Sequence, residues 1–338
     1  MFIQLKNQVF KLIGDPHLGK EFKNGVPIAR RGERERKQFE LFKKELNDIH
    51  TPTGARVTAV IIMGDIFDRF FVPDHIKSEV SDMIEFHAAN YPDVDYVVIR
   101  GNHDCSRDIM EESSFNILQR MLSKLPNVIF VSENYLYNKG KLCPWLMFCG
   151  YNEFTPTSEI DYGTNVLDAV FGHWDMQAIG GADHNLIPLA KLVKITSMIY
   201  NGHVHTPSIT NLMDEAQVIC VGSMMPYSHG EDPTEQIYIT RTMEDYLAET
   251  LLQGASYHDK VLRLKLKRGE EVPEGLANEC LQFSIQYIDE DEKEETEVKM
   301  EEFSFEALFK GVLSEVSEET AEYWWKKYRE KVGHDLNA

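Results

Sequence analysis

The 338-residue sequence has no apolar run long enough to cross a membrane as a helix. Its longest mostly apolar stretch, Val57–Met63, is far shorter than the roughly 20 residues that a bilayer requires. Residues 1–7 also lack the basic segment, apolar block and cleavage site of a signal peptide. We therefore expect a cytoplasmic protein without a membrane partner.

Cysteine is scarce: the chain has five cysteines, an odd number, and no CxxC pair. This usage does not favour a disulfide framework, which small secreted domains build from an even number of cysteines. We expect reduced thiols, as in the cytosol.

Basic residues are also in short supply. Lysine and arginine number 35 against 55 acids, which gives a formal net charge of −20. Overall charge therefore opposes binding to nucleic acid or to anionic membranes, and any such contact must be local or supplied by a partner. The 43% of hydrophobic residues is that of a folded globular protein and excludes wholesale disorder.

Short β-rich runs alternate with helical stretches, which predicts a layered α/β fold. The predicted strands are Val9–Ile13, Val57–Met63, Asp95–Arg100, Leu146–Gly150, Leu167–Phe171, Ser197–Tyr200 and Gln217–Val221. The predicted helices are Arg34–Ile49, His75–Ala89 and Ser113–Lys124.

The pattern changes after about residue 245. Lys260–Lys267 and Leu281–Ile288 alternate apolar and polar residues as half-buried strands do, and residues 289–297 contain seven acids. Helical periodicity then returns. We predict four parts: a main domain at 1–245, a small α+β capping domain at 255–290, an acidic linker at 289–300 and a C-terminal helical element at 301–334.

Five polar motifs stand at the ends of predicted strands. They are Gly14-Asp15-Pro16-His17, Gly64-Asp65-Ile66-Phe67-Asp68, Gly101-Asn102-His103-Asp104, Gly172-His173-Trp174 and Gly202-His203-Val204-His205. In an open α/β sheet, ligands bind beyond the carboxyl ends of the strands, so these motifs can converge on one site. We expect the glycines to allow tight turns that point the polar side chains into the cleft.

The side chains in these motifs are typical metal ligands. Asp, Asn and neutral His offer oxygen and nitrogen donors that suit Mn²⁺, Mg²⁺, Fe²⁺ or Zn²⁺. Seven candidate ligands are more than one ion usually takes from a protein. Two ions about 3.5–4 Å apart and bridged by a carboxylate would use them, and such a pair clamps phosphoryl oxygens during in-line displacement.

The ordered set DxH, GDxxD, GNHD, GH and GHxH resembles the calcineurin-like metallophosphoesterase superfamily, whose fold is a layered β-sandwich flanked by helices. Three details are similar to the SbcD-type nucleases, whose eukaryotic relatives are the meiotic-recombination-eleven subunits: GDPHLG, GDIFD, and the segment Val221–Glu231 after GHVH. The resemblance covers residues 8–240.

The resemblance implies a ligand set. One ion would be held by Asp15, His17, Asp65 and His205, and the second by Asp65, Asn102, His173 and His203. His103 would stabilise charge on the phosphate and protonate the leaving oxygen, and Asp104 would orient the His103 ring. The ions would be Mn²⁺, with Mg²⁺ as the alternative, and a water that they activate would attack phosphorus.

One departure from the family pattern concerns Asp68. It stands where some relatives carry a catalytic histidine, so no role beyond shaping the site is predicted for it.

The implied activity is that of a DNA exonuclease and endonuclease subunit. It would act with an SbcC-like ABC/SMC ATPase in DNA recombination, repair and replication, and would form a homodimer, for which the helices at 75–89 and 113–124 are candidates. An apolar stripe in the C-terminal element would dock on the ATPase as a helix in a groove, or else pack within the chain. Its aromatic members are Trp324, Trp325 and Tyr328.

Lys20–Lys44 holds nine bases directly after the first motif. We predict that Arg30, Arg31 and Arg34 contact the DNA backbone. The alternative is a solvated helix with pairs such as Glu33–Lys37.

Two other functions remain open. Asp68-Arg69 is similar to part of the GDxxDRG motif of Ser/Thr phosphatases, although Phe70 replaces the last glycine of that motif. A protein phosphatase or small-molecule phosphodiesterase is therefore the alternative enzyme. A non-catalytic scaffold would have lost metal ligands, whereas every expected ligand position is filled here.

Trp174, beside His173, is expected to pack against the sheet rather than stack on a base.

Overall fold

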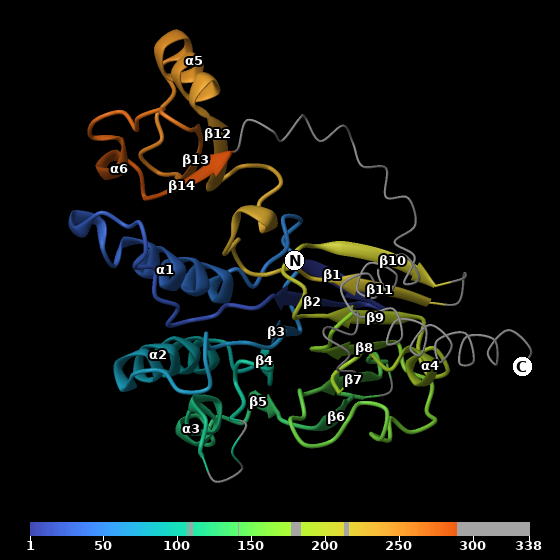
Figure 1. Cartoon of the computed structure of the whole chain (residues 1–338). Coiled ribbons are helices and arrows are strands. Elements are labelled where there is room, and N and C mark those ends of the chain that lie inside the picture. The colour runs from blue at the N-terminus through green and yellow to red at the C-terminus, as the bar shows by residue number, and fades with distance from the viewer. Residues whose placement is uncertain (107, 109–110, 141, 177–183, 213–215, 289–338) are drawn as a thin grey trace, which may run out of the picture. The chain divides into compact units, whose positions relative to one another are not determined.

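The computed structural model describes the chain except for residues 107, 109–110, 141, 177–183, 213–215 and 289–338 (Figure 1). The chain divides into two units, Met1–Tyr287 and Ile288–Ala338. The predicted linker at 289–300 and the element at 301–334, with Trp324, Trp325 and Tyr328, lie outside the described residues and stay predictions.

The first sheet has five strands in the order β1-β2-β3-β4-β5. Their bounds are Phe2–Leu5, Gln8–Ile13, Ala59–Ile62, Asp95–Ile99 and Val128–Val131. β1 is antiparallel to β2, and the remaining pairs are parallel. β3 and β4 are fully buried, which explains why their sequences, apart from Asp95 at the start of β4, are apolar runs rather than alternating ones.

Three helices cover one face of this sheet: α1 (Glu33–Asn47), α2 (Asp74–Asn90) and α3 (Ser114–Met121). Figure 1 shows them together on the side away from the second sheet. Their buried residues, such as Phe42, Ile84 and Phe115, form one core cluster with Val60 and Val98 of the sheet.

The second sheet has six strands in the order β10-β11-β9-β8-β7-β6. In chain order from β6 to β11 their bounds are Asn134–Tyr137, Leu146–Cys149, Ala169–Gly172, Met198–Asn201, Ser208–Leu212 and Ala216–Cys220. The four central strands are parallel, and the two edge strands are antiparallel to their neighbours.

The two large sheets pack face to face. Phe10, Ile61 and Val97 of the first sheet share a core cluster with Phe148 and Phe171 of the second. A third cluster lies on the outer face of the second sheet and includes Leu192 of the short helix α4 (Leu189–Leu192) and Trp174. The predicted layered α/β fold is confirmed, and Trp174, with 2% of its surface exposed, packs in the core as expected.

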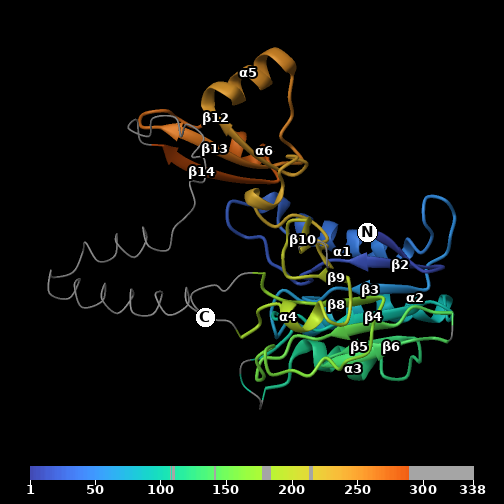
Figure 2. The same ribbon diagram turned by 90° about the vertical axis from the view of Figure 1, so that its right-hand side faces the viewer.

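A third, three-stranded sheet follows, with strands β12 (Tyr238–Thr242), β13 (Val261–Lys267) and β14 (Gln282–Ile288) (Figure 2). The helices α5 (Met243–Gln253) and α6 (Leu276–Glu279) connect them, and the small domain has its own apolar core. β12 begins before the predicted boundary at residue 245, and α5 crosses it, so the division into 1–245 and 255–290 stays a prediction.

None of the helices that the structure describes is long and apolar enough to span a membrane.

Candidate metal centre

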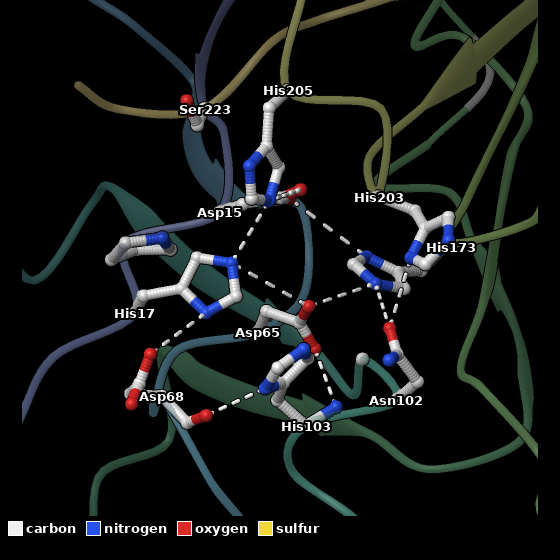
Figure 3. Close-up of polar contacts among 12 residues, drawn as sticks. Asp15, His17, Asp65, Asp68, Asn102, His103, His173, His203, His205 and Ser223 are labelled. Carbon is white, nitrogen blue, oxygen red and sulfur yellow. Dashed lines mark hydrogen bonds and ion pairs between the residues drawn. The ribbon is translucent and has the colours of Figure 1, made fainter. Parts of the chain in front are cut away.

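The polar motifs meet at the carboxyl edge of both large sheets. Asp15 and His17 follow β2, Asp65 follows β3, and Asn102 and His103 follow β4. From the second sheet, His173 follows β8, and His203 and His205 follow β9. Figure 3 shows the other six predicted ligands gathered around Asp65. The convergence predicted from the motif positions is therefore observed.

One group of donors consists of Asp15, His17 and His205. The Nε2 atoms of the two histidines are 3.0 Å apart, and Nε2 of His205 is 3.8 Å from Oδ2 of Asp15. Both carboxylate oxygens of Asp15 are buried without a hydrogen-bond partner. A buried charge without a partner is costly, so this group fits a divalent cation.

A second group consists of Asp65, His173 and His203, with Asn102 beside it. Nε2 of His173 lies 3.3 Å from Oδ2 of Asp65 and 2.9 Å from Oδ1 of Asn102. Oδ1 of Asn102 is also 3.0 Å from Nδ1 of His203. Because Oδ2 of Asp65 is also 3.8 Å from Nε2 of His17, Asp65 lies between the two groups, where a bridging ligand belongs.

Three of the histidines have their second ring nitrogen held by an acceptor. Nδ1 of His173 is 2.9 Å from the carbonyl of Met63. Nε2 of His203 is 2.6 Å from Asp175, and Nδ1 of His205 is 3.2 Å from Glu231. An acceptor there takes the ring N–H and leaves the other nitrogen as a lone-pair donor toward the centre, as metal-binding histidines require.

Asp175 and Glu231 were not predicted as site residues. The available signals were weak: Asp175 stands two residues after His173, and Glu231 ends the segment that resembles the SbcD-type nucleases. Neither spacing reveals which ring nitrogen the carboxylate faces.

The Asp175–His203 pair leads to a testable expectation. Asp175→Asn should lower the affinity for Mn²⁺ about 10–100-fold, the usual cost of losing a partner that orients a metal ligand. Titrating activity against Mn²⁺ measures the change, and Asp161→Asn, which leaves His203 and its partner intact, is the control. An unchanged titration midpoint would mean that Asp175 does not position His203.

Burial sets the charge states of the first group. It lowers the pKa of His17 to about 3, so the ring is neutral and one of its nitrogens keeps a lone pair for a cation. Burial raises the pKa of Asp15 to about 7, so this carboxylate needs a nearby positive charge to stay ionised at neutral pH. Burial also favours a raised pKa for Asp65, but the attraction and hydrogen bond of His173, together with the neighbouring His17 and His103, hold that pKa below its usual range. A bound cation would take over this role and leave His173 neutral, as a metal ligand must be.

The backbone of the centre is strained. His17, Asp65 and His203 adopt φ angles of 46°, 47° and 64°, in the left-handed region that non-glycine residues usually avoid. Such strain is concentrated at functional sites, where the surrounding structure holds it in place.

The motif glycines are required mainly for space. A Cβ on Gly101 would lie 2.2 Å from Oδ1 of Asp65, and one on Gly202 would lie 2.2 Å from the carbonyl oxygen of Met63. Of the five glycines that begin the motifs, Gly64 has a positive φ, of 109°, and the others do not. The expected tight turn therefore explains Gly64, whereas close packing explains Gly101 and Gly202.

His103 is placed at the exposed rim of the centre. Its backbone N–H donates to Oδ1 of Asp65 at 2.8 Å, and its ring Nδ1 is 2.5 Å from the carbonyl oxygen of Asp68 (Figure 3). The ring centroid lies 4.8 Å from that of His17. This position suits a side chain that meets the substrate beside the ions.

The predicted role of Asp104 is wrong. Its carboxylate is fully buried and accepts hydrogen bonds from the backbone N–H groups of Gly101, Phe67 and Ile66, at 2.9, 3.1 and 3.3 Å. It therefore ties together the two loops that carry Asp65 and Asn102, while the backbone carbonyl of Asp68 holds the His103 ring.

The predicted DNA contacts of Arg30 and Arg34 do not fit their positions. Arg30 is buried and donates to the carbonyls of His258 and Glu279. Arg34, 2% exposed, donates to the side chains of Gln282 and Tyr238 and stacks 3.7 Å above the ring of Phe22. Arg34, on α1, therefore joins this helix to strands of the third sheet, and Arg30, which precedes α1, joins the chain to other parts of the small domain. Arg31 alone of the three is exposed.

Arg34→Met should therefore destabilise the protein. We expect a loss of about 2–4 kcal/mol, because the buried hydroxyl of Tyr238 and the half-buried side-chain oxygen of Gln282 lose a charged donor. Urea unfolding followed by tryptophan fluorescence measures this loss, and Arg36→Met, an exposed neighbour on α1, is the control. Weakened DNA cleavage with unchanged stability would instead restore the original prediction.

The seven predicted ligands thus form a donor set for two divalent cations, supported by the unpartnered oxygens of Asp15. Among solved structures, the chain is similar to that of a dimetal phosphatase from Danio rerio, with 13% identity, a TM-score of 0.40, and coverage of 65% of this chain and 88% of that one. No curated protein matches the sequence. The sequence model of the calcineurin-like phosphoesterase family matches residues 9–207, more than half of the chain. The protein therefore belongs to the calcineurin-like phosphoesterase family.

Proposed function

We propose that this metallophosphoesterase is a Mn²⁺-dependent DNA nuclease subunit. It cleaves phosphodiester bonds as an exonuclease and endonuclease and acts as a homodimer with an SbcC-like ABC/SMC ATPase in DNA recombination, repair and replication. The supporting observation is that the segment resembling the SbcD-type nucleases, Val221–Glu231, forms part of the metal centre.

Several contacts join this segment to the first group of donors. Glu231 faces Nδ1 of His205, and the backbone N–H of Ser223 donates to the carbonyl of His205 at 3.0 Å. The hydroxyl of Tyr227 donates to the carbonyl of Pro16 at 2.5 Å. The segment therefore positions ligands from both ends of the motif series, which supports assigning the chain to the nuclease branch.

The donor set also supports Mn²⁺. Four histidines, two aspartates and one asparagine mix nitrogen and oxygen donors, whereas Mg²⁺ prefers oxygen and water. Two such ions supply polarisation of the phosphoryl group and activation of a water nucleophile.

His103 would act as the general acid. Because Nδ1 faces the carbonyl of Asp68, the imidazolium form of this exposed residue holds its second proton on Nε2. From there it can protonate the departing sugar oxygen. The seven predicted ligands would hold the ions that bind the reacting phosphate, and Asp104 keeps the loops of Asp65 and Asn102 at a fixed separation.

A phosphatase is the second candidate, favoured by one observation. Arg69 is half exposed at the rim, with Nη2 3.6 Å from Oδ2 of Asp68, where an arginine could bind the terminal oxygens of a phosphomonoester. The segment at 221–231 gives no such support to a phosphatase, so the nuclease remains the main proposal.

The test uses purified full-length protein with Mn²⁺, Mg²⁺ or EDTA. The substrates are linear duplex DNA, single-stranded DNA, bis(p-nitrophenyl) phosphate and a phosphopeptide. We expect Mn²⁺-dependent cleavage of DNA and of the small diester, abolished by EDTA. Release of phosphate from the peptide without cleavage of either DNA would establish the phosphatase instead.

The proposed ATPase partner needs a separate test. The unit Ile288–Ala338 is divided from the rest of the chain, so deleting residues 301–338 should remove co-purification with an SbcC-like ATPase and keep hydrolysis of the small diester. Trp324→Ala with Trp325→Ala should have the same effect in the full chain. Co-purification that survives both changes would place the partner surface elsewhere.

A further inference from the structure

Because the net charge of the chain is −20, binding of a polyanion requires cationic side chains close to the metal centre. Two arginines predicted for this purpose, Arg30 and Arg34, are engaged with the small domain. A different cation stands beside the metal centre: Lys20, whose backbone N–H donates to the carbonyl of the ligand His17 at 3.1 Å.

The ammonium group of Lys20 is fixed at the rim of the centre. Its Nζ is 2.9 Å from Oδ1 of Asp68 and 5.4 Å from the ring centroid of Tyr227. The same oxygen of Asp68 is 3.9 Å from Nδ1 of His17. The side chain of Lys20 nevertheless keeps 32% of its surface exposed, against 12% for Asp68, so the lysine faces solvent and the carboxylate lies beneath it.

Asp68 organises this rim through two different groups. Its carboxylate contacts Lys20 and, through Oδ2 at 3.6 Å, Arg69. Its backbone carbonyl faces the ring of His103. Two permanent cations thus share one carboxylate, which leaves a net positive charge next to the side chain that meets the leaving group.

We propose that Lys20, held in place by Asp68, binds a phosphate group adjacent to the scissile one. An ammonium group has three donors, and one contact with Asp68 leaves the others for a phosphate oxygen. The ligand class is a strand of successive phosphodiesters, as in a nucleic acid. This inference rests on the proposed nuclease function and assigns to Asp68 the role that the sequence left open.

The test compares a substrate with neighbouring phosphates and one without. A thymidine oligonucleotide has them, and bis(p-nitrophenyl) phosphate does not. Lys20→Met should lower kcat/KM about tenfold more on the oligonucleotide than on the small diester. It should also reduce the slope of log kcat/KM against log salt by about 0.7, the value for one phosphate contact on a single strand.

Lys23→Met is the matched control, because Lys23 is 68% exposed and pairs with Glu21 at 2.6 Å, away from Asp68. Lys20→Arg should retain the salt slope. Metal content and melting temperature are measured for every variant, so that loss of the centre is recognised.

Each outcome is decisive. A larger loss on the oligonucleotide, absent in Lys23→Met, supports the subsite. Equal losses on both substrates, an unchanged oligonucleotide rate, or the same effect from Lys23→Met would overturn it. If the unmodified protein hydrolyses the small diester and leaves the oligonucleotide intact, the proposed nuclease function fails, and the subsite fails with it.

Discussion

Replacing Asp65 by asparagine should lower hydrolysis of bis(p-nitrophenyl) phosphate by at least about a thousandfold. Asp65 is 1% exposed and lies between the two groups of donors, so the amide removes a negative charge from both groups at once. Metal ions contribute several kcal/mol of charge stabilisation, and each 1.4 kcal/mol is a factor of ten in rate.

The measurement pairs kcat in Mn²⁺ with metal content by mass spectrometry. Bound Mn²⁺ should fall below two ions per chain, while circular dichroism stays unchanged because asparagine has the size of aspartate. Asp93→Asn is the control, since Asp93 is 62% exposed and pairs with Arg56 on the surface. Two ions and near-normal activity in Asp65→Asn would remove Asp65 from the bridging position.

The second large effect concerns His103. His103→Ala should lower kcat on DNA about 10²–10³-fold, within the range of a lost general acid. The loss should be smaller on bis(p-nitrophenyl) phosphate, because nitrophenolate is a weak base and leaves without a proton. Metal content should not change, since the backbone contact of His103 with Asp65 survives the substitution.

The control for His103 is His75→Ala, a substitution at the start of α2. It should leave both substrates at their normal rates. Equal losses on DNA and on the nitrophenyl ester in His103→Ala, or loss of bound Mn²⁺, would contradict the role of a proton donor.

The sequence predicted the central strands well and the edges poorly. The seven strands predicted for the main domain correspond to β2, β3, β4, β7, β8, β9 and β11 within about two residues, and the two predicted at 260–267 and 281–288 correspond to β13 and β14. Strands buried on both faces carry continuous apolar runs that stand out in a sequence. In contrast, β10 is exposed along most of its length, so its residues SITNL carry little periodic signal, and it was missed.

The metal-binding donor residues could be predicted from the sequence, but the contacts that position them could not. The motif spacing predicted that Asp15, Asp65, Asn102 and the histidines would meet, because parallel strands end at the same edge. The roles of Asp104 and Asp68 depend on which backbone groups the folded loops present to each carboxylate. The burial of Arg34 depends on Tyr238 and Gln282, more than 200 residues away, and no local pattern contains that information.

The origin of the ligands has a mechanical consequence. Asp15, Asp65 and Asn102 belong to loops of the first sheet, and His173, His203 and His205 belong to loops of the second. Bound ions would therefore cross-link the two layers at one end of the sandwich, in addition to the apolar cluster between the sheets and the contacts of His173 with Met63 and Asp65. Removing the ions by chelation should therefore loosen the contact between the two sheets at this end first. The melting temperature should fall with EDTA, as linkage requires. Amide hydrogens near Gly64 and Gly202 should exchange sooner than those at the opposite ends of the same strands.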